Sequence, residues 1–173
     1  MTAQTPEPGP EAPPTEAPET ATGFRRLLGY RTAEWREGHA VLEMDLDERH
    51  MNRAGVLHGG ALATLIDTAC GLAATWAEAE APPRLCVTLS LAVSFTGQAA
   101  AGRVRATARL RGGGRRIVFC SAEVTDAAGR LIGMGEGSFR YRSDPAGNHV
   151  ASPAGDPGPE DAGPTAGNGT GAH

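Results

Sequence analysis

The sequence predicts an α+β domain in which a curved antiparallel sheet wraps around one long central helix. The helix is the clearest element, because ten of the fourteen residues from Ala61 to Ala74 are apolar, so it should be buried on nearly every side. Strand-like segments flank the helix, and short glycine-rich turns separate the later ones, as antiparallel neighbours require. The remaining face of such a helix needs a further cover, and a second copy of the chain is the simplest one.

Two strand-containing segments precede the helix, Phe24–Trp35 and His39–Leu46, with a turn at Glu37-Gly38 between them. The second segment alternates between two sets of side chains, which is typical of a strand with one buried face. We place the helix itself at about Leu57–Glu78, and Pro82-Pro83 terminates it.

Four strand-like runs follow the helix and form a predicted antiparallel meander. In the second run, every odd position is arginine or threonine and apolar residues lie between them, which indicates one polar and one buried face. The turns after the first three runs contain glycine, at Gly97, Gly112-Gly113-Gly114 and Gly129. The runs are Cys86–Thr96, Arg103–Arg111, Arg116–Thr125 and Arg130–Arg142.

The composition divides the chain into three parts. Residues 1–22 are mostly Pro, Glu, Thr and Ala, and residues 144–173 are mostly Gly, Pro, Ala, Asp and Asn. Neither tail buries enough apolar surface to offset its ordering entropy, so we expect both to be disordered around a domain at 23–143. The net charge is −4 and the tails contribute −8, which leaves the domain mildly basic. That charge suits a phosphate-bearing ligand but not nucleic acid.

Three cysteines, Cys70, Cys86 and Cys120, each lie within an apolar segment. Their odd number and their spacing favour reduced, buried thiols over disulfides or a metal site, and so a cytoplasmic protein. The N-terminus has no basic region followed by an apolar stretch, so we expect no signal peptide. The apolar helix is too short to cross a membrane and contains Asp67.

The residues that indicate chemistry lie where a polar, glycine-rich loop, Asn52–Gly60, runs into the helix. Gly59 and Gly60 expose backbone N–H groups at the helix start, where the helix dipole favours developing negative charge. Asp67 lies two turns further on, and a buried carboxylate is costly unless it is paired or used. An oxyanion site and a carboxylate on one short element predict acyl transfer or hydrolysis.

This motif resembles the hotdog-fold acyl-CoA thioesterases, specifically the PaaI-like group of the phenylacetate pathway. The resemblance covers roughly residues 24–143 and rests on the intervals from Asn52 to His58 and from His58 to Asp67, with Gly55 and Gly59-Gly60 between them. It implies that two subunits pair their sheets edge to edge, with active sites between the two central helices. It also implies a homodimer or a homotetramer.

The resemblance implies a role for each residue of the motif. Asp67 corresponds to the catalytic carboxylate, either a general base on water or a nucleophile that forms a mixed anhydride. The Gly59 N–H corresponds to the group that polarises the thioester carbonyl. His58 and Asn52 correspond to residues that position thioester and water from the partner subunit. A further hydroxyl comes from the strand after the helix, which places it at Thr88.

Other substrate contacts are expected around this centre. Gly60 and Thr64 lie beside Gly59 and Asp67 on the helix. Alternation in the strand of Thr88 puts Leu89, Leu91 and Val93 on the opposite face. Arg115 and Arg116, after the triple glycine, are candidates for CoA phosphates because a guanidinium suits phosphate oxygens. A solvated hairpin tip is the alternative for this arginine pair.

Each of these residues also has a purely structural interpretation. Asp67 could be satisfied by Thr64, Thr68 or backbone donors. His58 could be a helix cap and Asn52 an ordinary turn residue, while Gly59-Gly60 could permit close packing. The whole motif together favours catalysis.

The sequence therefore predicts an acyl-CoA thioesterase that needs no metal or redox cofactor. Phenylacetyl-CoA or its ring-hydroxylated form is suggested as substrate by the resemblance alone. A non-catalytic acyl-CoA sensor on the same scaffold is the alternative, and a hotdog-fold dehydratase is a third. The dehydratase is disfavoured because no histidine follows His58 within the helix.

Overall fold

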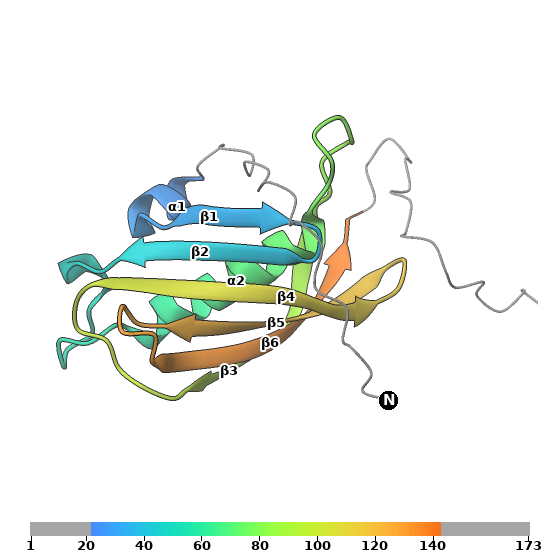
Figure 1. Ribbon diagram of the computed structural model, residues 1–173. Helices are drawn as coiled ribbons and strands as arrows, with labels where there is room; N and C mark the ends of the chain where they lie inside the picture. Colours follow the sequence, from blue (N-terminus) through green and yellow to red (C-terminus); the bar gives the residue numbers. More distant parts are fainter. Residues whose placement is uncertain (1–21, 143–173) are drawn as a thin grey trace, which may run out of the picture.

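The computed structural model describes residues 22–142, and these form one antiparallel sheet and three helical segments. The six strands are ordered β1-β2-β4-β5-β6-β3, and the sheet curves around α2 (Figure 1). This confirms the predicted α+β architecture. The tails predicted to be disordered lie outside the described residues, apart from Thr22. In chain order the elements are α1 (Gly23–Leu28), β1 (Arg31–Arg36), β2 (His39–Asp45), the 3₁₀ helix η1 (Glu48–His50), α2 (Gly59–Thr75), β3 (Cys86–Phe95), β4 (Arg103–Gly113), β5 (Ile117–Thr125) and β6 (Leu131–Tyr141).

The central helix α2 is shorter at both ends than the sequence predicted. It begins at Gly59 because His58 is its N-cap: the backbone of His58 is extended and its ring accepts a hydrogen bond from the Gly60 N–H. Leu57 lies outside the helix, where it forms an isolated antiparallel bridge with Met51 and donates its N–H to the Ala99 carbonyl. The helix ends at Thr75, before the extended backbone of Trp76.

Within the single chain only one face of α2 is buried, and the cover of its other face by a second copy stays a prediction. The sheet covers one side of the helix, and Thr64, Asp67, Thr68 and Gly71 on the other side remain partly exposed. This face could be covered only by something beyond the described chain. The buried residues are Ala61, Leu62, Leu65, Ile66, Ala69, Cys70, Ala73 and Ala74.

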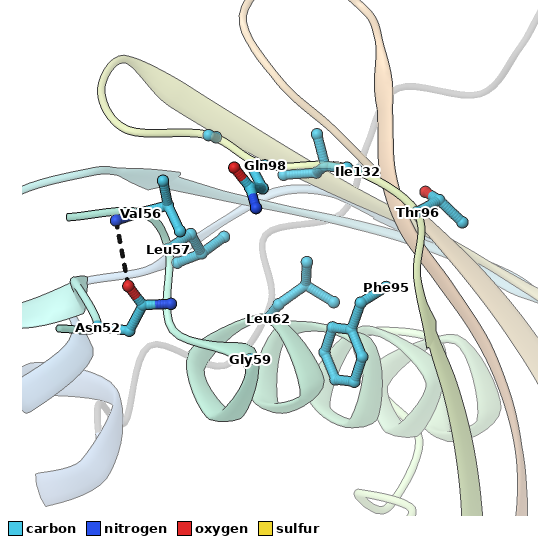
Figure 2. A pocket seen from close by; sticks show the side chains of 11 residues that line it. Asn52, Val56, Leu57, Gly59, Leu62, Phe95, Thr96, Gln98 and Ile132 are labelled. Atoms are coloured by element: carbon cyan, nitrogen blue, oxygen red, sulfur yellow. Dashed lines mark hydrogen bonds between the residues drawn. The ribbon is translucent and has the colours of Figure 1, made fainter. Parts of the chain in front are cut away.

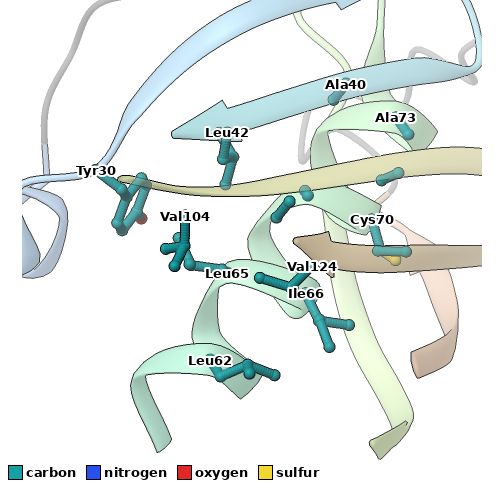
Figure 3. Close-up of a cluster of buried hydrophobic side chains, with 14 of the residues drawn as sticks. Tyr30, Ala40, Leu42, Leu62, Leu65, Ile66, Cys70, Ala73, Val104 and Val124 are labelled. Atoms are coloured by element: carbon teal, nitrogen blue, oxygen red, sulfur yellow. The ribbon is translucent and has the colours of Figure 1, made fainter. Parts of the chain in front are cut away.

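The core lies between the buried face of α2 and the concave face of the sheet (Figure 3). Leu65, Ile66 and Cys70 of the helix pack with Leu42 of β2 and Val124 of β5. The sheet opposite the helix start is lined by glycine. A Cβ on Gly133 would lie 2.6 Å from Leu62 Cδ2, and one on Gly135 would lie 3.0 Å from Ile66 Cγ2. Small residues in β6 therefore let the helix approach the sheet closely.

Two predicted features of the sheet are different in the structure. The strand-containing segment predicted at Phe24–Trp35 does include β1, but it begins with helix α1, which Thr22 caps and the left-handed Gly29 ends. The strands β4, β5 and β6 form the predicted meander, but β3 pairs with β6 at the sheet edge. Residues 96–102 therefore cross to β4 and do not form a hairpin.

The three cysteines are free thiols; Cys70 and Cys120 are buried, and Cys86 is partly buried. Burial raises the pKa of Cys86 to about 11 and that of Cys120 to about 12, and it raises the pKa of Cys70 further. A thiol with a raised pKa is a weak nucleophile. No helix among residues 22–142 is long and apolar enough to span a membrane.

Candidate active site

The loop before α2 is a compact turn built on Asn52. Its side-chain oxygen accepts hydrogen bonds from the Ala54 N–H at 2.8 Å and the Val56 N–H at 3.3 Å. The Asn52 N–H donates in turn to the Val56 carbonyl, and Gly55 supplies the positive φ of 71° that the turn requires. The amide nitrogen of Asn52 points away from these bonds toward the helix start (Figure 2). It is therefore a donor held at the site.

The segment between this turn and α2 is held in place by hydrogen bonds of the buried residue His50. The His50 Nδ1 accepts from the Asp47 N–H at 3.0 Å, and its Nε2 lies 2.7 Å from the Leu28 carbonyl oxygen. The His50 carbonyl then accepts the His58 N–H at 2.8 Å. Sequence analysis missed His50, because a lone histidine in a loop carries no spacing signal. It sets where the helix cap lies.

Only one of the two glycine N–H groups at the helix start is free. The Gly60 N–H donates to His58 Nδ1 at 2.9 Å, so this nitrogen carries a lone pair and the ring proton of neutral His58 is on Nε2. Within residues 22–142 the Gly59 N–H has no acceptor. Because it lies at the positive end of α2, it is an available donor for a developing oxyanion.

A pocket of about 370 Å³ opens beside the Gly59 N–H (Figure 2). Phe95, at the end of β3, forms one wall: its ring is so close that a Cβ on Gly59 would lie 3.2 Å from it. The Phe95 side chain is nevertheless 59% exposed, so it lines the pocket and is not a core residue. The lining comprises Asn52, Val56, Leu57, Gly59, Leu62, Phe95, Thr96, Gly97, Gln98, Ala99 and Ile132.

The carboxylate of the predicted site is held by one hydroxyl. Thr88 Oγ1 donates to Asp67 Oδ1 at 2.8 Å, which joins β3 to α2. The alternative partner Thr64 donates its hydroxyl to the Gly60 carbonyl instead, at 2.9 Å. The predicted face for Leu91 and Val93 is wrong, because a bulge between Thr88 and Ser90 shifts the register and both side chains pack on the helix side with Thr88.

One chain does not bring the two halves of the site together. Gly59 and Asp67 are eight residues apart on α2, which corresponds to about 12 Å along the helix axis. Arg115 and Arg116 are further away. The Tyr141 N–H binds the Arg116 carbonyl and the Tyr141 hydroxyl binds the Ala74 carbonyl, so this turn lies at the opposite end of α2 from Gly59.

Of the eleven residues that line the pocket, sequence analysis identified only Asn52 and Gly59 as site residues. It missed the other nine, among them Phe95, Thr96 and Gln98. The signal in this segment was the end of a predicted strand at Thr96 with the turn residue Gly97 after it. That signal places Phe95 at a strand end but does not indicate that its side chain lines a pocket.

Comparison with known proteins agrees with the fold. The thioesterase superfamily model matches residues 54–132. Human acyl-coenzyme A thioesterase 13 is 33% identical over 118 residues, which are 66% of this chain and 82% of the human protein. The crystal structure of zebrafish thioesterase superfamily member 2 aligns with a TM-score of 0.61 at 31% identity, over 70% of this chain and 88% of that one.

A variant of the phenylacetic acid degradation protein PaaI from Thermus thermophilus also aligns. Its TM-score is 0.60 at 28% identity, over 69% of this chain and 98% of that chain. The curved sheet around α2 and the capped, glycine-rich helix start define a hotdog-fold thioesterase. The chain belongs to the thioesterase superfamily and is a thioester hydrolase.

Proposed function

We propose that the protein hydrolyses acyl-CoA thioesters to the free acid and CoA. The observation that carries this proposal is the free Gly59 N–H at the head of a helix that also bears Asp67, a carboxylate held by Thr88. Acyl-CoA is the substrate class named for the human relative. A water and a carboxylate suffice for the reaction, so we propose no metal or redox cofactor.

The Gly59 N–H binds the thioester oxygen and polarises the carbonyl. Charge that develops on this oxygen meets a donor and a helix dipole that are already in place, which stabilises the transition state. The His58 Nε2–H and the Asn52 amide add donors beside it, because their other polar atoms are engaged in the cap and the turn. Gly60 and Thr64 complete the surface of the helix start that the substrate meets.

Asp67 activates the attacking group. As a general base it takes a proton from water, the water oxygen bonds to the carbonyl carbon, and the C–S bond then breaks to release CoA thiolate, which takes up the proton. As a nucleophile its own oxygen bonds to that carbon, CoA leaves, and water hydrolyses the mixed anhydride. In either case Thr88 holds Oδ1 and leaves Oδ2 to act.

The active assembly is proposed to be a homodimer, alone or paired into a homotetramer. A thioester cannot touch Gly59 and Asp67 of one chain when they lie about 12 Å apart, so Asp67 of one subunit serves the Gly59 of its partner. Two surfaces support this pairing: β3 is an edge strand with exposed Val87 and Leu89, and the Asp67 face of α2 is open.

The acyl group is proposed to be phenylacetyl or hydroxyphenylacetyl. Support comes from the degradation pathway named for the Thermus relative and from an apolar pocket wall of Leu62, Phe95 and Ile132. Arg115 and Arg116 would contact CoA phosphates only across a subunit interface. We also propose a cytoplasmic location, which suits three free thiols.

Thiol release from a panel of acyl-CoAs, from acetyl through phenylacetyl and hydroxyphenylacetyl to palmitoyl, tests the function. We expect Asp67→Ala to lower kcat by roughly 100- to 10,000-fold with an unchanged assembly size. Asp45→Asn, on the outer face of β2, is the matched control. Binding without release from any thioester would make the protein a sensor, and hydration of an enoyl-CoA would make it a dehydratase.

We also propose residues 23–143 as the functional domain. A fragment with these bounds should keep its assembly and its kcat, because every contact of the site lies within it. Size-exclusion chromatography and thiol release compare it with the full chain. Loss of either property would assign a role to the tails.

A further inference from the structure

A second cavity, of about 460 Å³, adjoins the pocket at Gly59. The two share Val56, Gln98 and Ala99 as lining residues. Together they form one groove, which starts at the free Gly59 N–H and runs between the segment 96–102 and the turn that joins β5 to β6. It ends at Arg130.

The lining of the second cavity changes character along its length. Five of its residues are alanines, at 99–101 and 127–128, so the walls are apolar and low. Gln98 supplies a side-chain amide where the two cavities meet. Walls of this kind suit a slender uncharged chain that carries amide groups.

The far end of the groove presents a cation in a fixed orientation. Arg130 binds Asp126 through Nε at 2.8 Å and Nη2 at 2.6 Å. Asp126 is itself saturated, since its Oδ1 accepts the Ala128 and Arg130 N–H groups, and these bonds lower its pKa. The Arg130 side chain is 73% exposed and has no other partner within residues 22–142, so its Nη1 hydrogens are available.

We propose that this groove binds the CoA portion of the substrate, with the pantetheine arm along the alanine walls and a CoA phosphate on Arg130. This inference rests on the proposed thioesterase function. Pantetheine is a slender chain with two amides that joins the sulfur to the phosphates, so its chemistry follows the groove from Gly59 outward. A guanidinium suits phosphate oxygens. Arg130 reaches the groove within one chain, whereas Arg115 and Arg116 lie at the other end of α2.

Three thioesters of one acyl group test the proposal: the CoA, pantetheine and N-acetylcysteamine esters. Arg130→Gln should raise KM about ten- to a hundredfold for the CoA ester and leave it unchanged for the other two, which lack phosphate. Ala128→Leu narrows the groove and should raise KM for the CoA and pantetheine esters but not for the N-acetylcysteamine ester. Arg111→Gln, which removes an arginine bound to Ser121 on the outer face, is the matched control.

Unchanged KM values in Arg130→Gln would overturn the proposal, and a selective CoA defect in Arg115→Gln or Arg116→Gln would move the phosphate to that turn. An equal loss on all three esters would show that Arg130 is structural, and this also overturns it. Calorimetric titration with free CoA tests the CoA-binding groove separately from the proposed thioesterase function. If wild type hydrolyses nothing, the proposed function fails, yet weaker CoA binding by Arg130→Gln than by Arg111→Gln still supports the groove.

Discussion

Thr88 donates its hydroxyl hydrogen to Asp67 Oδ1 across 2.8 Å, from the edge strand β3 to the partly exposed face of α2. The contact holds one carboxylate oxygen, and within residues 22–142 the other accepts no hydrogen bond. Because β3 is also the edge at which we propose subunits to pair, displacement of this edge would move the Asp67 carboxylate.

Thr88→Val tests this contact without a change in size. It removes a hydrogen bond to a charged group, worth about 1.5–3 kcal/mol, so kcat should fall roughly 10- to 100-fold with little change in KM. Thr88→Ser keeps the hydroxyl and should keep most of kcat. Equal loss in both variants would mean that the methyl group and not the hydroxyl matters.

The register of β3 shows why sequence reasoning succeeded only in part. Strict alternation predicts that Thr88 faces the helix and that Leu91 and Val93 face away. The bulge after Thr88 adds one residue, so all three side chains lie on the helix side. A bulge depends on pairing with β6, and a single strand's pattern does not contain that information. The face on which Thr88 lies could therefore be predicted from the sequence, whereas the face on which Leu91 and Val93 lie could not.

The position of β3 in the sheet could not be predicted from local sequence patterns either. Alternation and turn glycines define the β4-β5-β6 meander, whose neighbours are close in sequence. The pairing of β3 with β6 depends on packing across α2, where Gly133 and Gly135 admit Leu62 and Ile66. The helix start, in contrast, is set by the neighbouring residues His58 and Gly60 and could be predicted from sequence to within two residues.

Gly59→Ala should disturb the pocket through Phe95. The new Cβ would lie 3.2 Å from the Phe95 ring, and this exposed ring has room to swing away, so we expect a severalfold fall in kcat/KM with little loss of stability. In a Phe95→Ala background the same substitution should have no further effect. A double-mutant cycle on kcat/KM measures the coupling. Additive losses would show that Gly59 acts independently of the ring.

Gly135→Ala should weaken the packing of β3 and α2 on β6. Its Cβ would lie 2.6 Å from the Ala92 backbone oxygen and 3.0 Å from Ile66 Cγ2, so backbone must move. We expect the free energy of unfolding in urea to fall by about 1–3 kcal/mol. Gly114→Ala is the matched control, since its Cβ would have no atom within 4 Å. A similar loss in both variants would point to backbone entropy and not to the contact.

A buried histidine on the outer side of the sheet predicts acid sensitivity. His39, at the start of β2, is 4% exposed; its Nε2 lies 3.2 Å from Glu34 Oε2, and within residues 22–142 its Nδ1 has no partner. Burial lowers the pKa of His39, Glu34 opposes this shift, and the nearby Arg36 and Arg109 charges add to it. The folded protein therefore resists protonation of this ring more than the unfolded chain does.

The sign of the effect follows from the direction of that shift. With a folded pKa below the unfolded value of about 6.5, the contribution of His39 to stability is complete above that pH and is lost as the pH falls toward the folded pKa. Urea unfolding at pH 7.5 and 5.5 should therefore show a larger loss of stability in wild type than in His39→Gln, which keeps a donor for Glu34 but does not titrate. Equal losses of stability in the two proteins would assign the acid sensitivity to other groups. A gain of stability at pH 5.5 in wild type would mean that the effect of Glu34 outweighs that of burial and that the pKa of His39 is raised.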